Sequence, residues 1–459
     1  MVFNSDVFLF LFFPVVFALF WLARTKQQRY LLLTAAGYVF YGYWNWKYCF
    51  LLLFSSFVSF FAARAITATA DRRRQRAWLV ASITVDLTIL GVFKYANFIA
   101  GSLHELVPSI APVIVNVALP IGISFYTFHT ISYIVDVYVG RVRATNNVFE
   151  YLTYVSFFPQ LVAGPIARFR QVESDLEQID RRPSDELMAR GLGFFAVGMI
   201  KKVIVADSIA GYVVPMLAAF DSLTVVGAWL VALGYTLQLY YDFSGYSDMA
   251  VGLGCLFGIR LPQNFNAPYR ALGFRDFWRR WHISLSTWLR DYLYLPLGGN
   301  RRGPGRTYLN LMITMLLGGL WHGANWTFVV WGGYHGALLI ADRKLEPLLT
   351  RMPTVLYRAL TFALVVVGWV FFRAPTLDLA FAWLGEMVGI GAAGLGASLI
   401  TSGIGVLVVT GLIAINVVPE TWDVRFPYGR RFAPAVAVAL FVCYLFVNGS
   451  DTVFLYYQF

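Results

Sequence analysis

The stretch YCFLLLFSSFVSFFAARAI, residues 48–66, decides the class of fold. Arg64 is its only charged residue, and a helix of about 20 apolar residues is long enough to span the hydrocarbon core of a bilayer. The basic cluster DRRRQR, residues 71–76, follows shortly after it. Lys and Arg next to a span favour the cytoplasmic side. The stretch therefore predicts a transmembrane helix that ends at the cytoplasmic face.

Similar apolar runs recur along the chain, separated by short polar breaks. The alternating pattern of a membrane β-barrel strand is absent. We therefore predict an all-α polytopic membrane protein with one integral membrane domain over residues 1–459. Roughly ten to thirteen helices are expected to cross the bilayer, with the rest re-entrant or interfacial. The predicted spans lie near residues 7–23, 30–45, 48–66, 77–98, 113–138, 150–164, 189–217, 224–241, 244–259, 308–320, 324–341, 355–373, 378–396, 400–418 and 433–449.

The composition supports this class of protein. Hydrophobic residues make up 59% of the chain and charged residues 13%, whereas soluble proteins carry about 25% charged residues. The net charge of +11 comes from short loops, which fits the positive-inside rule better than nucleic-acid binding. The three cysteines lie in apolar runs and predict neither a disulfide framework nor a metal site.

Residues 273–296, GFRDFWRRWHISLSTWLRDYLYLP, are too charged for an ordinary span and too aromatic for a loop. Aromatic residues recur at helical spacing with arginines between them, which predicts an amphipathic helix at the membrane interface. His282 and Ser286 are then one turn apart on one face. A surface anchor with snorkelling arginines explains the same pattern without a site.

Residues 316–336, LLGGLWHGANWTFVVWGGYHG, place His322 in an almost wholly apolar stretch. Ionisable residues at membrane depth are costly and usually face a cavity or a partner. Asn325 is expected on the same side of the same helix, and nearby glycines leave room for a ligand. A hydrogen-bonded structural histidine is the alternative. His335 is interpreted as structural, near a helix end.

The polar residues of YYDFSGYSD, residues 240–248, are interpreted as a hinge between two spans, with Gly245 at the turn. No Walker loop, GxSxG elbow, HExxH motif or nucleotide fingerprint occurs. These absences exclude most soluble enzyme classes and the ATP-driven pumps.

Two histidines among Trp and Gly residues fit acyl transfer from a thioester to a hydroxyl. The thioester is already activated, so the enzyme mainly needs a base and a dry, shaped site. A neutral histidine is the usual base near pH 7. A proton relay in a transporter uses the same kind of residue, so the residues alone leave both functions open.

Several motifs resemble the membrane-bound O-acyltransferase (MBOAT) family, and within it the branch that contains the membrane subunit of bacterial alginate O-acetyltransferase. They run in family order from residue 1 to about residue 340. They are MVFNS (1–5), LPIGISF (119–125), FFPQLVAGP (157–165), YDFSGYSDM (241–249), NFNAPY (264–269), WHISLSTWLRDY (281–292) and LWHGA (320–324).

The resemblance implies a ring of helices around a central funnel through the bilayer. It implies that His322 is the catalytic histidine and that His282 is the second polar residue of the site. Our hypothesis is that His322 takes the hydroxyl proton, while His282 orients the acceptor or stabilises the oxyanion. The residues expected to line the site are Trp321, Asn325, Arg290, Asp291 and Ser286.

It also implies an acyl thioester as co-substrate, acetyl-CoA or an acylated carrier, with no metal and no bound cofactor. Arg279 and Arg301 are candidates to hold the anionic part of this donor, although positive-inside anchoring explains them equally well.

The implied function is O-acetylation of alginate or a similar exopolysaccharide, with the acetyl group carried from a cytoplasmic thioester across the bacterial inner membrane. The implied partners are membrane lipid and periplasmic acetyltransferases that resemble SGNH hydrolases, and nucleic acid is not among them. Three alternatives remain: D-alanyl or other acyl transfer to a cell-wall polymer, non-catalytic transport of an acyl or glycan intermediate, and a scaffold that only recruits periplasmic enzymes.

Overall fold

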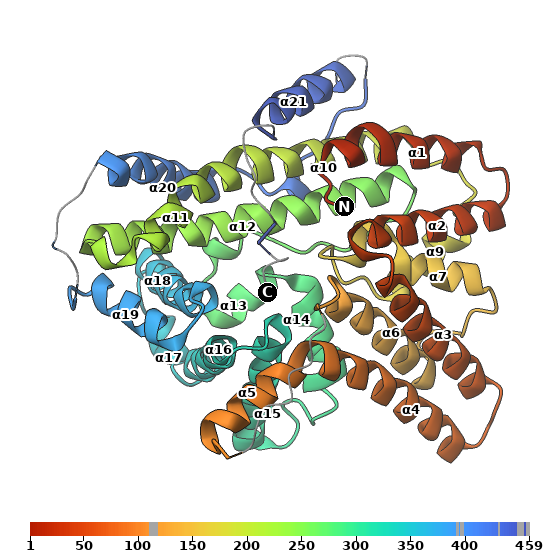
Figure 1. Ribbon diagram of the computed structural model, residues 1–459, viewed down its shortest axis with the longest axis horizontal. Helices are drawn as coiled ribbons and strands as arrows, with labels where there is room; N and C mark the ends of the chain where they lie inside the picture. The colour runs from red at the N-terminus through yellow and green to blue at the C-terminus, as the bar shows by residue number, and fades with distance from the viewer. Residues whose placement is uncertain (110–117, 392–393, 395–398, 430–431, 448–453, 456–459) are drawn as a thin grey trace. The chain divides into compact units, whose positions relative to one another are not determined.

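The computed structural model describes residues 1–109, 118–391, 394, 399–429, 432–447 and 454–455 (Figure 1). Within these ranges helices are the only regular secondary structure, which confirms the all-α prediction. Contacts divide the chain into two compact units. Unit 1 is Met1–Ala196, Tyr246–Pro262 and Phe426–Ala439, and unit 2 is Val197–Gly245, Gln263–Arg425 and Leu440–Phe459.

Unit 1 contains the N-terminal helices and most of α10. Its elements are η1 (Val7–Phe12), α1 (Phe13–Leu22), α2 (Lys26–Asn45), α3 (Tyr48–Thr67), α4 (Arg72–Leu90), η2 (Gly91–Tyr95), α5 (Ala96–Leu106), α6 (Ile123–Tyr138), α7 (Val148–Ser156), α8 (Phe158–Leu161), α9 (Phe169–Glu177) and α10 (Asp185–Met199).

One buried carboxylate ties three of these helices together. Asp86 on α4 accepts hydrogen bonds from Ser55 Oγ of α3 at 2.6 Å and from Thr130 Oγ1 of α6 at 2.8 Å. Polar side chains that bond across helices are a common source of cohesion within a membrane. Asp86 is therefore satisfied by hydroxyl donors and serves helix packing.

Four helices in the described part of the chain are long and apolar enough to cross a membrane. They are Tyr48–Thr67, Arg72–Leu106, Thr354–Arg373 and Gly403–Asp423, and Val7–Leu22 and Phe432–Val447 are shorter apolar helices. Tyr48–Thr67 contains the stretch that decided the class of fold. The helices confirm a multi-pass membrane protein, and the full number of crossings and the funnel stay predictions.

Three of the predicted spans lie partly outside the described residues. Residues 113–138, 378–396 and 433–449 overlap with α6, α19 (Leu377–Met387) and α21 (Phe432–Val447), respectively. Residues 113–117, 392–393, 395–396 and 448–449 of these spans are not described.

The predicted hinge at residues 240–248 is wrong, because one continuous helix, α12 (Val225–Leu256), passes through it. Gly245 lies inside this helix, where a Cβ would come 2.8 Å from the carbonyl oxygen of Gly198. Glycine therefore serves close helix packing here. The Nζ of Lys202 lies 2.7 Å from a carboxylate oxygen of Asp242. Since this charge is paired, the helix can continue through the polar stretch.

Unit 2 contains the elements that surround the two histidines of interest, beginning with η3 (Ile200–Ala206) and the first part of α12. The remaining elements are α11 (Asp207–Ala218), η4 (Phe220–Ser222), η5 (Pro268–Arg270), α13 (Phe274–Arg280), α14 (Ile283–Leu289), η6 (Arg290–Tyr294), α15 (Gly303–His322), α16 (Trp326–Lys344), α17 (Glu346–Leu349), α18 (Thr354–Arg373), α19, α20 (Leu399–Val417) and η7 (Thr421–Asp423).

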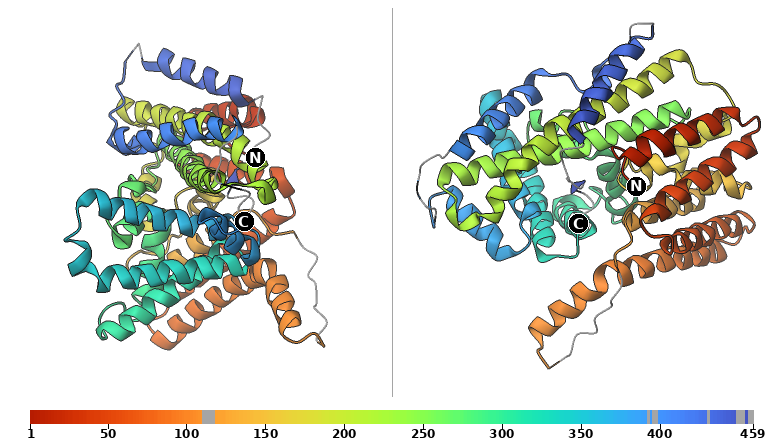
Figure 2. Two further views of the ribbon diagram at one scale, coloured as in Figure 1. Left: turned by 90° about the vertical axis from the view of Figure 1, so that its left-hand side faces the viewer. Right: turned by 45° about the horizontal axis from the view of Figure 1, so that its top comes forward.

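Helices α15, α16 and α18 lie side by side in unit 2 (Figure 2). The backbones of α15 and α16 approach closely where glycines face the other helix. A Cβ on Gly319 would come 2.2 Å from the carbonyl oxygen of Phe328, and a Cβ on Gly332 would come 2.4 Å from that of Met315. Small residues at a crossing allow this approach in membrane proteins. The crossing brings the end of α15, with His322, against α16.

Candidate active site

Residues 273–296 form two short helices and a π-helical turn, α13, α14 and η6, instead of the single helix that we predicted. The break falls at His282, whose φ of 43° lies in the left-handed region. A residue with a Cβ adopts this conformation only at a cost. The break turns the chain so that the imidazole points into the protein interior, where His282 is 0% exposed.

A second chain segment supports this strained turn. The N–H of Asn266 donates to the carbonyl of Arg280, and the N–H of Ile283 donates to the carbonyl of Asn264, both at 2.9 Å. Ala267, at the end of this segment, also has a left-handed φ, of 44°. The segment 264–267 therefore runs beside the turn at His282 and holds it on both sides.

The imidazole of His282 is fixed by one hydrogen bond and by aromatic packing. Its Nδ1 lies 3.0 Å from Oδ1 of Asn264, which also accepts from Ser284 Oγ at 2.8 Å. The ring of Phe243 meets it edge to face at a centroid distance of 4.7 Å. Burial lowers the pKa of His282, which keeps the ring neutral near pH 7.

His322 is the last residue of α15, because the chain turns to an extended conformation at Gly323 and a new helix begins at Trp326. Its ring packs against Trp331 and Phe372, each at a centroid distance of 5.1 Å. The ring of Trp321 lies 4.9 Å from that of His322 and 6.0 Å from that of His282. Trp321 therefore lies within contact range of both histidines.

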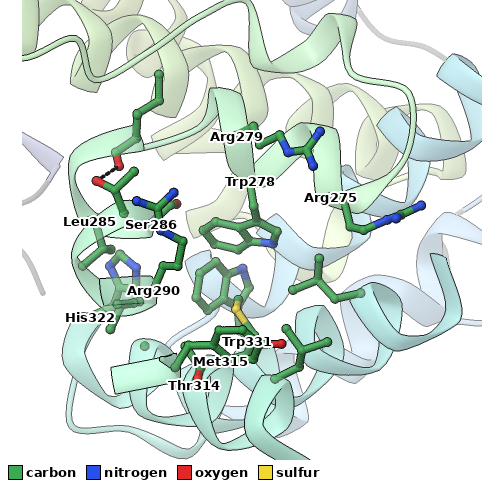
Figure 3. A pocket seen from close by; sticks show the side chains of 17 residues that line it. Arg275, Trp278, Arg279, Leu285, Ser286, Arg290, Thr314, Met315, His322 and Trp331 are labelled. Carbon is green, nitrogen blue, oxygen red and sulfur yellow. Dashed lines mark hydrogen bonds between the residues drawn. The ribbon is translucent and has the colours of Figure 1, made fainter. Parts of the chain in front are cut away.

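His322 lines a cavity of about 450 Å³, a size typical of small-molecule and cofactor pockets. Trp278 and Trp331 lie in the middle of this cavity in Figure 3, with His322 and Ser286 toward one side and Arg275 toward the other. Its other lining residues are mostly apolar, and they include Leu285, Leu289, Leu311, Met315, Gly318 and Leu339.

Three arginines, Arg275, Arg279 and Arg290, line the cavity, and we call them the arginine rim. Arg275 pairs with Asp342 at 3.0 Å and with Glu346 at 2.8 Å. Arg290 pairs with Asp291 at 2.7 Å. Arg279 is exposed and makes no ion pair with a described residue, so it is the rim arginine whose charge remains for an anionic ligand.

The cavity includes some of the predicted site residues but not all of them. Ser286, Arg290 and His322 line it, whereas His282, Trp321, Asp291, Asn325 and Arg301 are outside its lining. Asn325 does not share a helix with His322, which corrects our expectation, since it caps α16 by accepting the N–H of Thr327 at 2.9 Å. Its side chain also donates to the carbonyl of Pro375 at 2.8 Å. These contacts give Asn325 a role in capping the start of α16.

His335 lies in the interior of α16 and not near a helix end as we had predicted. Its ring is enclosed by aromatic residues, including Trp331 at 4.8 Å and Trp278 at 5.2 Å between centroids. Both of these tryptophans line the cavity. His335 therefore packs behind the cavity wall, which agrees with its structural interpretation.

The sequence analysis gave no role to Asn264, Trp278 or Trp331. Asn264 belongs to the motif NFNAPY. Polar residues in an apolar context were the feature of this motif that could have indicated a functional role for Asn264. Its pairing with His282 depends on two segments that are 18 residues apart in the chain. Trp278 was noted only as part of a helical aromatic pattern, which does not distinguish a cavity wall from a core, and Trp331 only as one of the Trp residues near His322.

The fold and the site define an all-α membrane protein with two buried histidines beside an apolar, arginine-rimmed cavity. The family model described as "MBOAT, membrane-bound O-acyltransferase family" matches residues 9–374. The chain therefore belongs to this family, as the sequence motifs had indicated, and it is an acyltransferase.

Relatives with curated names agree with this assignment. The chain is 47% identical over 401 residues to the "Probable alginate O-acetylase AlgI" of Pseudomonas aeruginosa. The aligned region covers 85% of this chain and 75% of that protein. It is 37% identical over 423 residues to the "Peptidoglycan O-acetyltransferase" of Helicobacter pylori, with coverages of 85% and 80%. The "Teichoic acid D-alanyltransferase" of Bacillus subtilis is 29% identical over 270 residues, with coverages of 55% and 68%.

Proposed function

We propose that this protein transfers an acetyl group from a cytoplasmic thioester to a hydroxyl acceptor, and thereby supports O-acetylation of alginate or a similar exopolysaccharide. The names of the relatives with the higher identities motivate the acetyl group and the polysaccharide. We further propose that residues 1–459 act as one membrane domain, since the family match runs from residue 9 to 374 and so includes parts of both units.

The observation that carries the proposal is the cavity between the arginine rim and His322. A volume of about 450 Å³ far exceeds the room that an acetyl group needs, so most of it suits the arm that carries the acyl group. The rim attracts the anionic part of such a donor, because Arg binds phosphate well. The apolar wall excludes water from the thioester and so protects it from hydrolysis.

In this proposal the two histidines form the catalytic pair, with His322 on the side of the donor. The donor is acetyl-CoA or an acetylated carrier, and no bound cofactor or metal takes part. Trp321, Ser286, Arg290 and Asp291 are the further residues that we assign to the surroundings of the site. The acceptor is a periplasmic acetyltransferase similar to SGNH hydrolases, which passes the acetyl group to the polysaccharide outside the bacterial inner membrane.

The test is an acyl-transfer assay with the purified full-length protein in lipid nanodiscs. Radiolabelled acetyl-CoA and an acetylated carrier are supplied in separate reactions, each with the periplasmic partner and alginate oligosaccharides. We expect covalent label on the partner or the oligosaccharide. In a parallel experiment with sealed proteoliposomes, label that enters the lumen without forming an ester favours a transporter. A preference for a D-alanyl thioester in the nanodisc assay favours cell-wall D-alanylation. Either result contradicts the proposal.

Replacing Arg279 with alanine is expected to raise the KM for the thioester donor roughly three- to tenfold, with little change in kcat. Arg279 carries the rim charge that no described acidic residue pairs with, and it lies away from His322 in Figure 3. The measurement is steady-state kinetics at low and high salt, where the difference from wild type should shrink as salt screens the charge. Arg306→Ala removes an equal charge from the start of α15, outside the cavity lining, and should leave the KM unchanged. Equal effects of the two variants would refute the role of Arg279.

A further inference from the structure

We propose that a groove at the start of α3 binds an anionic phospholipid of the membrane, with the lipid phosphate at Lys47 and one acyl chain between α3 and η2. The groove has a volume of about 590 Å³, within the range of pockets for small molecules. It belongs to unit 1 and shares no lining residue with the cavity at His322. Among the residues that line it are Asn45, Lys47, Tyr48, Leu51, Phe54 and Phe93.

The groove lies at one end of a membrane-spanning helix. The span Tyr48–Thr67 is about 30 Å long at 1.5 Å per residue, which matches the hydrocarbon core of a bilayer. The basic cluster of residues 71–76 follows the other end and favours the cytoplasmic side. The end at Tyr48 is therefore expected at the extracytoplasmic interface. Trp44 and Trp46 are exposed beside it, and tryptophan is enriched at such interfaces.

The groove is polar at the helix end and apolar toward the middle of the bilayer. Lys47, the residue before α3, has helical backbone angles, and Leu51 and Phe54 follow it after four and three residues. The three residues therefore lie on one helix face, which covers about 10 Å along the axis. Phe93 of η2 lines the groove with them. A polar mouth above an apolar track fits an amphiphile parallel to α3, as a phospholipid is in its leaflet.

Contacts of Tyr48 hold the wall of the groove in place. Its hydroxyl donates to the carbonyl of Ala118 at 2.6 Å. Its ring stacks on that of Trp44 at a centroid distance of 5.3 Å and meets the ring of Phe93 edge to face at 6.1 Å. Tyr48 thus connects the end of α2, the turn η2 and the chain at Ala118. The groove is therefore formed by the fold itself, as binding pockets usually are.

Lys47 brings a positive charge to the mouth that no nearby acid balances. No Asp or Glu occurs between residues 7 and 70, and Lys47 makes no ion pair with a described residue. Its backbone N–H donates to Oδ1 of Asn45 at 3.1 Å. A backbone N–H can only donate, so this atom is the amide oxygen, and the NH2 group of Asn45 can serve as a second donor. An ammonium and an amide donor together suit the oxygens of a phosphodiester.

A phospholipid accounts for both ends of the groove, which other occupants do not. A small free phosphate compound would meet Lys47 but would leave Leu51, Phe54 and Phe93 uncovered. An apolar helix of a second copy of this chain would cover the track but would leave the charge of Lys47 without a partner. An anionic head group is favoured over a zwitterionic one because one basic residue near the surface strengthens anionic lipid binding roughly fivefold.

The experiment uses the full-length protein in phosphatidylcholine nanodiscs that contain a small share of phosphatidylglycerol with a photoreactive group in one acyl chain. After irradiation, mass spectrometry of peptides locates the lipid. We expect adducts on residues 47–54 and at Phe93. Lys47→Gln should lower the yield of these adducts roughly fivefold. Photoreactive phosphatidylcholine in place of phosphatidylglycerol should give a yield that Lys47→Gln does not change.

Two further variants separate the apolar track from the charge. Leu51→Trp fills the track and should lower the adducts of both lipids at the groove. Arg76→Gln removes an equal, exposed charge from the basic cluster at the other end of the span and should leave the adducts at the groove unchanged. Thermal melts of each variant show whether it is folded.

Equal adduct yields in wild type and Lys47→Gln would overturn the inference, and so would an absence of adducts on residues 47–54. Displacement of the photoreactive lipid by sn-glycerol 3-phosphate would instead identify a site for a free phosphate compound. Cross-links between two protein copies at these residues would identify an interface between copies, and either result contradicts a lipid site. No arm of the experiment measures acyl transfer, so the lipid site and the proposed function can fail separately.

Discussion

His322→Ala is expected to lower kcat for acyl transfer at least about 100-fold while the protein still folds. The imidazole packs against Trp331 and Phe372 and lines the cavity that we propose for the donor. Under that proposal, its loss would remove the polar group that we place beside the thioester. In other enzymes, removing one positioned acid, base or oxyanion donor lowers the rate of the chemical step roughly 10²- to 10⁴-fold. The measurement is single-turnover acetyl transfer in nanodiscs, with donor binding measured separately to show that the loss is in the chemical step.

His282→Ala should show a loss of the same order, and the double variant should be little worse than either single one. Groups that act as one catalytic unit are strongly non-additive, whereas two independent binding contacts would multiply their effects. His104→Ala, at the end of α5 in unit 1, is the histidine control and should retain wild-type activity. Activity of His322→Ala within about threefold of wild type would remove this residue from the site.

The helical class was predictable from the sequence because apolar length is a local property. Residues 48–66 were read as a span, and the structure has a helix over Tyr48–Thr67. Breaks between helices were less predictable where tertiary contacts decide them. Asp242 looked like part of a hinge, but Lys202, which comes much earlier in the chain, pairs with it and lets α12 continue.

The reverse error occurred at His282, where periodicity predicted one helix. The aromatic pattern does continue at helical spacing through residues 273–296, yet the backbone turns at His282. The bonds that support this turn come from Asn264 and Asn266. Periodicity indicates which helix faces are buried, but it carries no information about hydrogen bonds from a distant segment. It could therefore predict neither the helix break at His282 nor the hydrogen bond between His282 and Asn264.

His322 was identifiable because an ionisable residue in an apolar stretch needs a reason. His282 lies in a charged, aromatic segment and was singled out with the help of the family motif. Which residues surround them was harder to predict. Asn325 is close to His322 in the chain, but the end of α15 separates the two. Trp331, which is farther from His322 along the chain, packs directly on its ring. Proximity at this site therefore follows the crossing of α15 and α16 more than it follows distance along the chain.

That crossing makes Gly319→Ala the substitution with the largest expected effect outside the histidines. A Cβ at Gly319 would come 2.2 Å from the carbonyl oxygen of Phe328 and 3.2 Å from Cα of Gly332. Backbone atoms cannot rotate away as a side chain can, so α15 and α16 must separate. We expect a loss of roughly 1–3 kcal/mol in stability, as for other overpacked interiors. Activity should fall more than about tenfold, because His322 and Trp331 are on the two helices that move.

Gly333→Ala provides the matched comparison at the same helix pair. Its Cβ would lie 3.5 Å from a methyl group of Leu316, an ordinary contact with a flexible side chain, and alanine favours a helix over glycine by about 1 kcal/mol. This variant should therefore be as stable as wild type or slightly more stable, with unchanged acyl transfer. Thermal unfolding in detergent and the nanodisc assay measure both properties. If Gly319→Ala matches Gly333→Ala in both, the close approach of α15 and α16 does not position His322, and the site must be held by the aromatic contacts alone.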